Sequence, residues 1–359
     1  MPVSGLTGVT AVAAGGSHCL ALNSDGTVAA WGRNYYGQLG DGTGTNRYTP
    51  VPVSGLSGVT AIAGGEAHSL ALKSDGTVWA WGFNIYGQLG DGTSSVRRTP
   101  VPVSGLSRVS AIAGGYEHSL ALKSDGTVRA WGYNFHGVLG DGTMTDRHTP
   151  VTVSGLSDVT AIGGGTYHSL ALRGDGTVWA WGANWRGGLG DGTTTERHTP
   201  VAVSGLSGVT AIAGGGGGHS LALNNDGTVW AWGYNFHGVL GDGTMTDRHT
   251  PVAVSGLSGI TAIAAGAYSS YALSADGSLW VWGDNSYGQL GLGDTALRLT
   301  PEHLLPPAGY RFNSIAASPD GYHALATLAP VPEPSTLALL GAGAVGLLAF
   351  AWRWKRATA

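Results

Sequence analysis

Residues 50–99 read PVPVSGLSGVTAIAGGEAHSLALKSDGTVWAWGFNIYGQLGDGTSSVRRT, and this stretch decides the fold. It contains four short runs suited to β-strands, separated by glycine-bearing turns. The runs are Pro50–Val53, Val59–Ala63, His68–Lys73 and Thr77–Trp81. In the last run Trp79 and Trp81 point to one side and the small Ala80 to the other, which is the two-residue period of a strand. The helical period is absent, so the unit is predicted to be all-β.

The same unit recurs along most of the chain. A Trp-Gly dipeptide returns every 50 residues, with one step of 51 where the run Gly214 to Gly218 adds a glycine. The predicted repeats are 1–49, 50–99, 100–149, 150–199, 200–250 and 251–300, followed by a partial copy at 301–328. Four strands per unit and about seven units predict a seven-bladed β-propeller, in which radial repetition leaves only short, protected strand edges.

The motif WGxNxxGQLGDGT, followed by a Pro-Val strand and AIAGGxxHSLAL, resembles the regulator of chromosome condensation repeat over about residues 1–328. The resemblance implies a seven-bladed propeller that closes by joining strands from the two chain ends. The seventh copy offers the runs Pro301–Leu305, Asn313–Ala317 and Tyr322–Thr327 but no Trp-Gly strand. We therefore expect the missing strand, and a signal peptide for export, to lie upstream of Met1.

Composition narrows the class of partner. Glycine accounts for 63 residues and charged residues for only 11%, with a formal net charge of −4. A mildly acidic chain without a basic stripe lacks the footprint of a nucleic-acid binder, so nucleic acid is not an expected partner. The single cysteine, Cys19, excludes an intrachain disulfide and is expected to be a small buried thiol.

A histidine recurs once per unit, and it is a candidate metal ligand only if several copies meet. The set is His18, His68, His118, His168 and His219, with Ser269 and Gly321 at that place in the sixth and seventh copies. One residue per blade distributes the side chains around a ring, whereas zinc needs about four ligands within roughly 2 Å. A structural role between blades is therefore expected, with no metal.

An aspartate also recurs, in the DGT turns. These residues are Asp41, Asp91, Asp141, Asp191 and Asp242. Each turn supplies one carboxylate, which is fewer than a calcium loop needs, and identical residues on separate blades do not form the paired acids of general acid–base catalysis. We therefore expect turn-forming aspartates, no cofactor and no enzymatic activity.

The turns of a propeller alternate between its two faces, and here one face varies much more than the other. The SGLSG and SDGT turns are nearly invariant, whereas the GGxxH turn and the long WGxNxxG…RxTP connection vary and carry aromatic residues. Variable aromatic loops on a rigid scaffold are typical of recognition surfaces, although some rings could instead pack beneath the long loop. The candidate binding residues are Tyr35, Tyr36, Phe83, Tyr86, Tyr116, Phe135, His136, Tyr167, Trp185, Arg186, Phe236, His237, Tyr268 and Tyr287.

The C-terminal tail has three parts. Residues 329–336 are a proline-rich linker with the motif Val331, Pro332, Glu333 and Pro334, residues 337–352 are free of charge, and residues 353–359 contain Arg353, Lys355 and Arg356. The charge-free run is predicted to be a hydrophobic transmembrane helix, with the basic end held in the cytoplasm. The three parts resemble the PEP-CTERM sorting signal of exopolysaccharide-producing bacteria. This resemblance implies export, recognition by an exosortase and removal of the tail; a plain membrane anchor is the alternative.

These expectations combine into one function. The chain is predicted to be an exported, non-enzymatic propeller, anchored in the inner membrane before processing and then located at the cell surface or in the matrix. Its aromatic loop face is expected to bind a protein or a polysaccharide. The alternatives are an inhibitor of a secreted hydrolase, a glycan-active enzyme, and a nucleotide exchange factor such as the family resemblance suggests.

Overall fold

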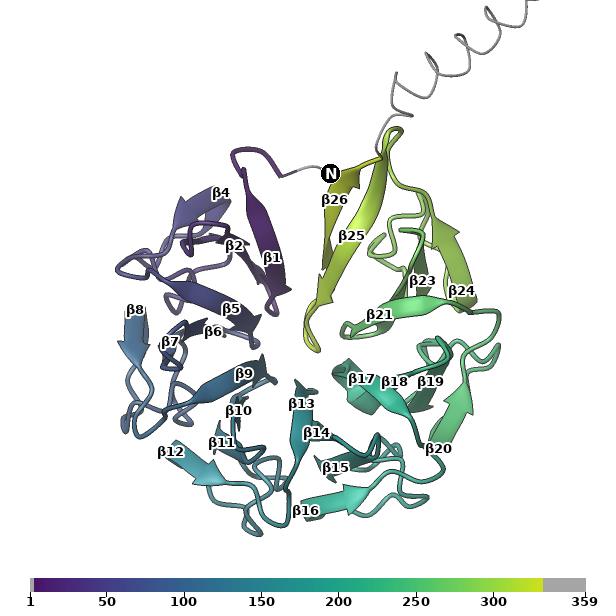
Figure 1. Cartoon of the computed structure of the whole chain (residues 1–359), viewed down its shortest axis with the longest axis horizontal. Coiled ribbons are helices and arrows are strands. Elements are labelled where there is room, and N and C mark those ends of the chain that lie inside the picture. The colour runs from purple at the N-terminus through teal and green to yellow at the C-terminus, as the bar shows by residue number, and fades with distance from the viewer. Residues whose placement is uncertain (1–2, 332–359) are drawn as a thin grey trace, which may run out of the picture.

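The computed structural model describes residues 3–331, which form a ring of radially arranged sheets (Figure 1). The predicted transmembrane helix at 337–352, the tail at 353–359 with Arg353, Lys355 and Arg356, and the motif residues Pro332, Glu333 and Pro334 lie outside the described residues. Val331 is the last described residue, and its side chain is exposed. Within residues 3–331, no helix is both long enough and apolar enough to span a membrane.

Six sheets have four antiparallel strands each, and every sheet follows chain order from the centre of the ring outwards. The first three blades are β1 (Val9–Ala14), β2 (His18–Asn23), β3 (Val28–Gly32) and β4 (Arg47–Pro52); β5 (Val59–Gly64), β6 (His68–Lys73), β7 (Val78–Gly82) and β8 (Arg97–Pro102); and β9 (Val109–Gly114), β10 (His118–Lys123), β11 (Val128–Gly132) and β12 (Arg147–Thr152).

The next three blades are β13 (Val159–Gly164), β14 (His168–Arg173), β15 (Val178–Gly182) and β16 (Arg197–Ala202); β17 (Val209–Gly214), β18 (His219–Asn224), β19 (Val229–Gly233) and β20 (Arg248–Ala253); and β21 (Ile260–Ala265), β22 (Ser269–Ser274), β23 (Leu279–Gly283) and β24 (Arg298–Leu304). A short 3-10 turn, η1 (Gly216–Gly218), precedes β18. The last sheet has two strands, β25 (Tyr310–Ala317) and β26 (Ala324–Pro330).

The prediction of an all-β propeller with four-stranded blades is confirmed, but the prediction of seven blades is wrong. The described residues form six four-stranded blades, and the remaining place in the ring holds only the β25–β26 hairpin. The reason lies in the pairing of the Pro-Val run. This run is the outer strand of the preceding blade, so the run expected to open the seventh copy pairs instead with β23 as β24.

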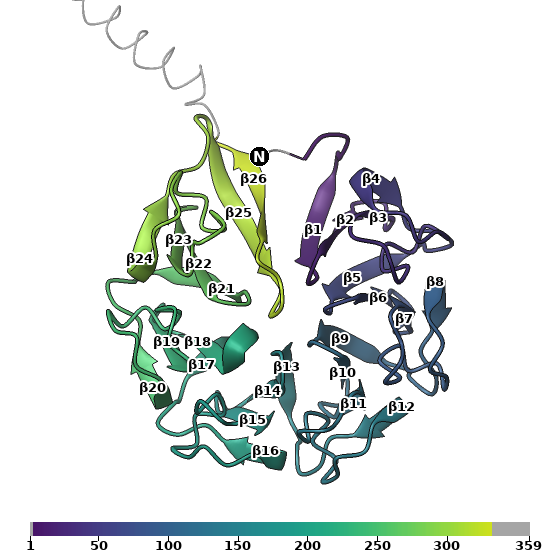
Figure 2. The same ribbon diagram turned by 180° about the vertical axis from the view of Figure 1, so that it is seen from behind.

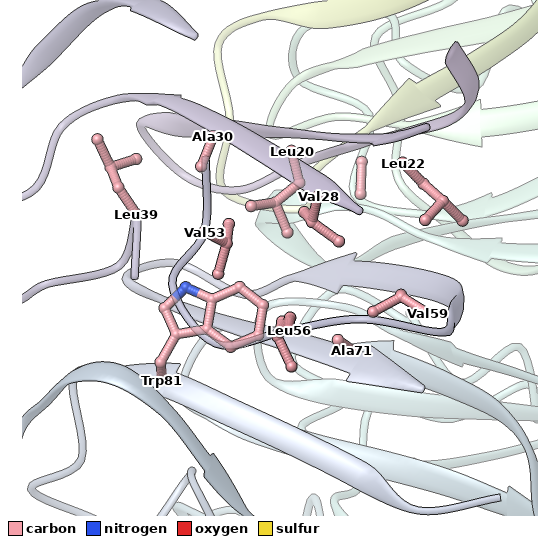
Figure 3. Close-up of a cluster of buried hydrophobic side chains, with 11 residues drawn as sticks. Leu20, Leu22, Val28, Ala30, Leu39, Val53, Leu56, Val59, Ala71 and Trp81 are labelled. Carbon is pink, nitrogen blue, oxygen red and sulfur yellow. The ribbon is translucent and has the colours of Figure 1, made fainter. Parts of the chain in front are cut away.

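The second to sixth blades each pack against the preceding blade through a buried tryptophan. Trp81 of β7 is fully buried and packs against the first blade, close to Leu39, Val53 and Leu56 (Figure 3). Its Nε1 donates a hydrogen bond of 2.8 Å to the carbonyl of Gln38. Trp131, Trp181, Trp232 and Trp282 repeat this arrangement, with Nε1 donating to the carbonyls of Gln88, Val138, Gly188 and Val239.

The recurring histidines link neighbouring blades, as the sequence predicts. His18 Nε2 lies 2.8 Å from Ser69 Oγ of the next blade, and Ser69 Oγ donates to the carbonyl of Gln38. The hydroxyl therefore accepts from Nε2–H, which leaves Nδ1 without a proton. Nδ1 of His18 is buried and has no hydrogen-bond partner. The same His–Ser contact joins His68 to Ser119, His118 to Ser169, His168 to Ser220 and His219 to Ser270.

The ring closes through a variant of this contact. His323, immediately before β26, places Nε2 at 3.3 Å from Sγ of Cys19, which stands where the other blades have serine. The assignment of Gly321 to the histidine place of the last copy is therefore wrong, because the β25–β26 turn is longer than the other GGxxH turns. Cys19 is buried as predicted, and burial raises the pKa of its thiol to about 12.

Candidate binding face

A buried asparagine holds each long loop in shape. Asn84 Nδ2 donates to Asp91 Oδ1 and to the carbonyls of Thr93 and Ser95, and its Oδ1 accepts from the Leu89 amide. Asn34, Asn134, Asn184 and Asn235 make the same set of contacts. Since the asparagine side chain is directed into the loop, the loop is rigid and the next residue projects into solvent.

The DGT aspartates complete these loops. Asp41 Oδ1 accepts from the amide and hydroxyl of Thr43, and Oδ2 lies 2.7 Å from Arg47 Nη2. Burial opposes ionisation of Asp41, but the hydrogen bonds from Thr43, Arg47 and Asn34 outweigh it and lower the pKa to about 2. The carboxylates are thus occupied in turn formation. Within residues 3–331 no group of three or more histidine, cysteine, aspartate or glutamate side chains is placed to hold a metal ion.

The structure places the candidate residues at two levels of exposure. Tyr35, Phe135, Trp185, Arg186, Phe236 and Tyr287 are exposed, with the aromatic rings between 53% and 79% accessible. Tyr36, Phe83, Tyr86, Tyr116, His136, Tyr167, His237 and Tyr268 are half-buried. None of these side chains is fully buried. Rings that pack beneath the long loop, the alternative given above, are therefore found only among the half-buried residues, and each of these keeps part of its surface exposed.

Many of these rings touch in a continuous run across four blades. Tyr36 and Phe83 have ring centroids 4.6 Å apart, and Phe83 continues to Tyr86 at 6.3 Å. The run reaches His136, whose ring lies 4.6 Å from Trp185 at an interplanar angle of 89°. The edge-to-face geometry contributes about 0.5–1.5 kcal/mol per pair beyond burial of area.

A second run covers the fifth and sixth blades and the hairpin. Phe236 contacts His237 at 5.4 Å, and His237 lies 4.7 Å from Tyr268. Tyr322, in the β25–β26 turn, connects Tyr268 to Tyr287 with centroid distances of 6.0 and 5.7 Å. The two runs approach each other at Arg186, which pairs with Asp247 at 3.3 Å and lies over the ring of Tyr234.

Sequence reasoning missed several members of this face. Tyr133 and Tyr234 occupy the same loop position as the predicted Phe83 and contact the predicted rings. Ile85, 57% exposed, follows its asparagine as Trp185 does. Comparison of equivalent positions across the repeats would have identified all three.

Between the two runs the face is hollowed. A cavity of about 290 Å³ is bounded by the loops of the third to sixth blades and by the β25–β26 turn. Figure 2, from behind, shows the tip of this hairpin and the η1 turn close to the centre of the ring. The predicted residues Tyr116, Tyr167, Trp185, Arg186 and Tyr268 line the cavity.

Comparison with known families is consistent with the geometry. A model described as the RCC1-like domain matches residues 1–165, and the regulator of chromosome condensation (RCC1) repeat matches 175–223, 226–273 and 276–325. A second model of the same repeat matches 159–187, 209–239 and 260–289. The chain is built of RCC1 repeats. In addition, the PEP-CTERM protein-sorting motif matches residues 330–356.

Solved structures share this fold. Human WBSCR16 superposes with a TM-score of 0.81 at 26% identity, over 91% of this chain and 88% of that chain. Prp20p from Saccharomyces cerevisiae, described together with its binding properties to Gsp1p and histones, has a TM-score of 0.76 at 25% identity, over 94% and 86%. Yeast RCC1 (Prp20) bound by Kap60 superposes at 0.79 with 24% identity, over 90% and 81%.

Among curated proteins, the human E3 ubiquitin-protein ligase HERC2 is 46% identical over 54 residues. The match covers 14% of this chain and 1% of HERC2. The mouse HERC2 protein matches to the same extent. A match of about one repeat supports the presence of RCC1 repeats and transfers no activity of the larger protein.

Proposed function

We propose that this chain is an exported, non-enzymatic propeller that binds a protein partner through the aromatic loops of one face. Export is supported by the PEP-CTERM match at residues 330–356. Recognition of the tail by an exosortase and passage through the inner membrane form part of the same proposal. The observation that carries the binding role is the pair of aromatic runs, in which exposed rings project from loops held rigid by buried asparagines.

The physical reason for binding is the low entropic cost of contact. Loops that are already ordered lose little conformational freedom when a partner docks, and Tyr, Trp and Arg are the residue types that most often dominate binding energy. Trp185 and Arg186 are adjacent in one loop, both are exposed, and both line the cavity. A polysaccharide is the second candidate, because the exposed faces of Trp185 and Phe236 also suit sugar rings.

Two of the other functions have less support. An inhibitor of a secreted hydrolase would use the same loop face, so it is a special case of protein binding. Guanine-nucleotide exchange fits poorly with a chain that carries an export motif. The absence of catalysis remains a proposal, supported by the assignment of the DGT aspartates to turn formation.

Loss of the exposed rings is expected to abolish partner binding. The full-length chain serves as bait for the extracellular fraction of the native host, beside the variant Phe135→Ser, Trp185→Ser, Phe236→Ser. Since single aromatic anchors contribute about 2 kcal/mol or more, the triple variant should weaken binding by at least about 100-fold. Captured proteins are identified by mass spectrometry, and their affinities are measured by calorimetry.

The matched control removes exposed apolar residues at the other end of the strands. Leu305 and Tyr310 are 73% and 47% exposed and lie at the β24–β25 connection, away from the aromatic loops. The variant Leu305→Ser, Tyr310→Ser should bind as the wild type does. Equal capture by the wild type and by the loop variant would contradict the proposal, and retention of the wild type by host polysaccharide alone would favour the second candidate.

A further inference from the structure

The cavity in the aromatic face has walls made mostly of aromatic rings. Tyr116 and Tyr167 stand 5.6 Å apart on one side and Tyr268 and Tyr322 6.0 Å apart on the other, measured between ring centroids. The exposed Trp185 lies 6.0 Å from Tyr167. A ligand in this cavity therefore meets the π-systems of several aromatic side chains, which attract cations.

One acidic side chain in this wall is incompletely paired. Asp320, in the β25–β26 turn, lines the cavity, and its Oδ1 accepts a hydrogen bond of 2.9 Å from Thr166 Oγ1. Its Oδ2 is buried and has no hydrogen-bond partner within the protein. Burial raises the pKa of Asp320 to about 7, and repulsion from Glu66 adds to the effect of burial although Thr166 opposes it. A buried carboxyl oxygen without a partner is costly, so this site favours a donor from outside.

Two glutamates nearby increase the negative charge. Burial raises the pKa of Glu117 to about 7, with further contributions from Glu66, Asp320 and Asp146. Burial also raises the pKa of Glu66, although Arg33 opposes it. Arg186, the arginine that lines the cavity, is already paired with Asp247. The acids repel one another, and a cation bound among them would relieve that repulsion.

The extra glycine of the fifth repeat forms the remaining wall. Gly216, Gly217 and Gly218 of η1 line the cavity. Gly217 has a φ of +63°, and a Cβ there would lie 2.9 Å from Tyr268 Cε1 and 3.0 Å from Tyr234 Cδ1. The glycine run therefore allows the backbone to approach both tyrosines without a side chain displacing them.

We propose that this cavity binds an alkylammonium group of the kind that ends a lysine side chain. The proposal deepens the binding role above, because the group would belong to the protein partner. A primary ammonium is a compact charge with three donors, which matches a carboxyl group that lines an aromatic cavity and has one oxygen already bonded to Thr166. A guanidinium fork needs both oxygens of a carboxylate, and here Thr166 occupies one of them. The cavity volume of about 290 Å³ exceeds what a bare metal ion needs.

The affinity should depend on pH in a definite direction. The ammonium stays charged up to about pH 10, whereas Asp320 and Glu117 lose their protons near pH 7. The acidic groups on the elements around the cavity are Glu66, Glu117, Asp146, Asp247 and Asp320. The basic groups are Arg33, the paired Arg186, His168 in the lining, His136 beside Trp185 and His237 beside Tyr268. Affinity for the ammonium should therefore rise as pH increases from 5.5 to 8.5.

The test is a titration of the full chain with n-butylammonium chloride, in which binding is measured by saturation-transfer difference NMR. A fragment of this size should bind with a dissociation constant of roughly 1–10 mM at pH 8 and about tenfold more weakly at pH 5.5. Asp320→Asn should reduce affinity about tenfold and weaken the pH dependence, to which Glu117 still contributes. Asp276→Asn, in the exposed ADGS turn that replaces SDGT in the sixth blade, is the matched control and should bind as the wild type does.

Three results would overturn the assignment. The first is no saturable binding of n-butylammonium up to about 50 mM, and the second is equal binding of n-butanol or glucose, which carry no charge. The third is equal or tighter binding of n-butylguanidinium. Since Phe135 and Phe236 do not line the cavity, a negative result here leaves partner capture by the exposed rings intact, and the two proposals can fail separately.

Discussion

Acidification from pH 7 to pH 4 is expected to unfold the propeller cooperatively. The histidines that join the blades are fully buried: His18, His68, His118, His168 and His219. Burial lowers their pKa values to about 3 for His18, His68 and His168 and to about 4 for His118 and His219. For His18, His68 and His118 the incoming proton would occupy a buried Nδ1 that has no acceptor.

The direction follows from proton uptake. An unfolded histidine is protonated below about pH 6.5, whereas these buried histidines stay neutral until the pH falls to about 3–4. Their contribution to the free energy of unfolding is therefore complete above about pH 6.5 and is lost as the pH falls towards 3–4. Around pH 5 the unfolded chain binds about five more protons on these histidines, while Glu117 and Asp320 bind up to two more in the folded state. A net uptake of about three protons makes stability fall by about 4 kcal/mol per pH unit.

The measurement is the free energy of urea unfolding between pH 7.5 and pH 5. His118→Gln keeps a donor near Ser169 and cannot titrate, so it should reduce the slope by about 1.4 kcal/mol per pH unit. His148→Gln, at an exposed position in β12, should leave the slope unchanged. A free energy that does not change between pH 7.5 and pH 5 would refute the structural role assigned to the buried histidines.

Removal of one inter-blade tryptophan is expected to cause the largest loss of stability from a single substitution. Trp181 is fully buried against the third blade, and its Nε1 donates to the Val138 carbonyl at 2.7 Å. Trp181→Ala should destabilise the protein by about 3–5 kcal/mol, because the substitution removes buried apolar surface and also leaves a cavity. Trp181→Phe should cost less, since Ser169 Oγ still donates to that carbonyl.

Trp179 in the same strand provides the matched control. It lies on the same face of β15 as Trp181 and packs against the same hydrophobic cluster, but it is only half-buried and lies under the guanidinium of Arg173. Trp179→Ala should cost about 1–2 kcal/mol, because Trp179 is only half-buried and its Nε1 donates within its own blade, to Thr177 Oγ1. Equal losses for Trp179→Ala and Trp181→Ala, measured by urea unfolding, would contradict the inter-blade role of the Trp-Gly motif.

The regular parts of this molecule could be predicted because every blade repeats them. The Trp-Gly strand, the histidine and the DGT turn each recur at a fixed spacing, and two-residue alternation assigns each to a strand or a turn. Strand partners were harder to predict. The Pro-Val run is equally compatible with opening its own sheet or closing the preceding one, and only the observed pairing of β24 with β23 decides between them.

The wrong prediction at Gly321 and the residues that sequence reasoning missed lie in turns that differ from blade to blade. The turn from Ser318 to His323 is longer than its equivalents, so the prediction placed Gly321 at a position that His323 occupies. Asp320 and Tyr322 lie in the same turn and therefore went unnoticed. Glu66 and Glu117 stand at variable positions of GGxxH turns, and their proximity to Asp320 depends on the ring geometry, which brings distant repeats together.

Location and intact mass of the mature protein in its native host test the central claim most directly. The proposed function predicts a species outside the inner membrane whose mass corresponds to a chain ending near Pro334, with its propeller exposed to extracellular partners. A soluble cytoplasmic protein of full length would contradict the exported-propeller account.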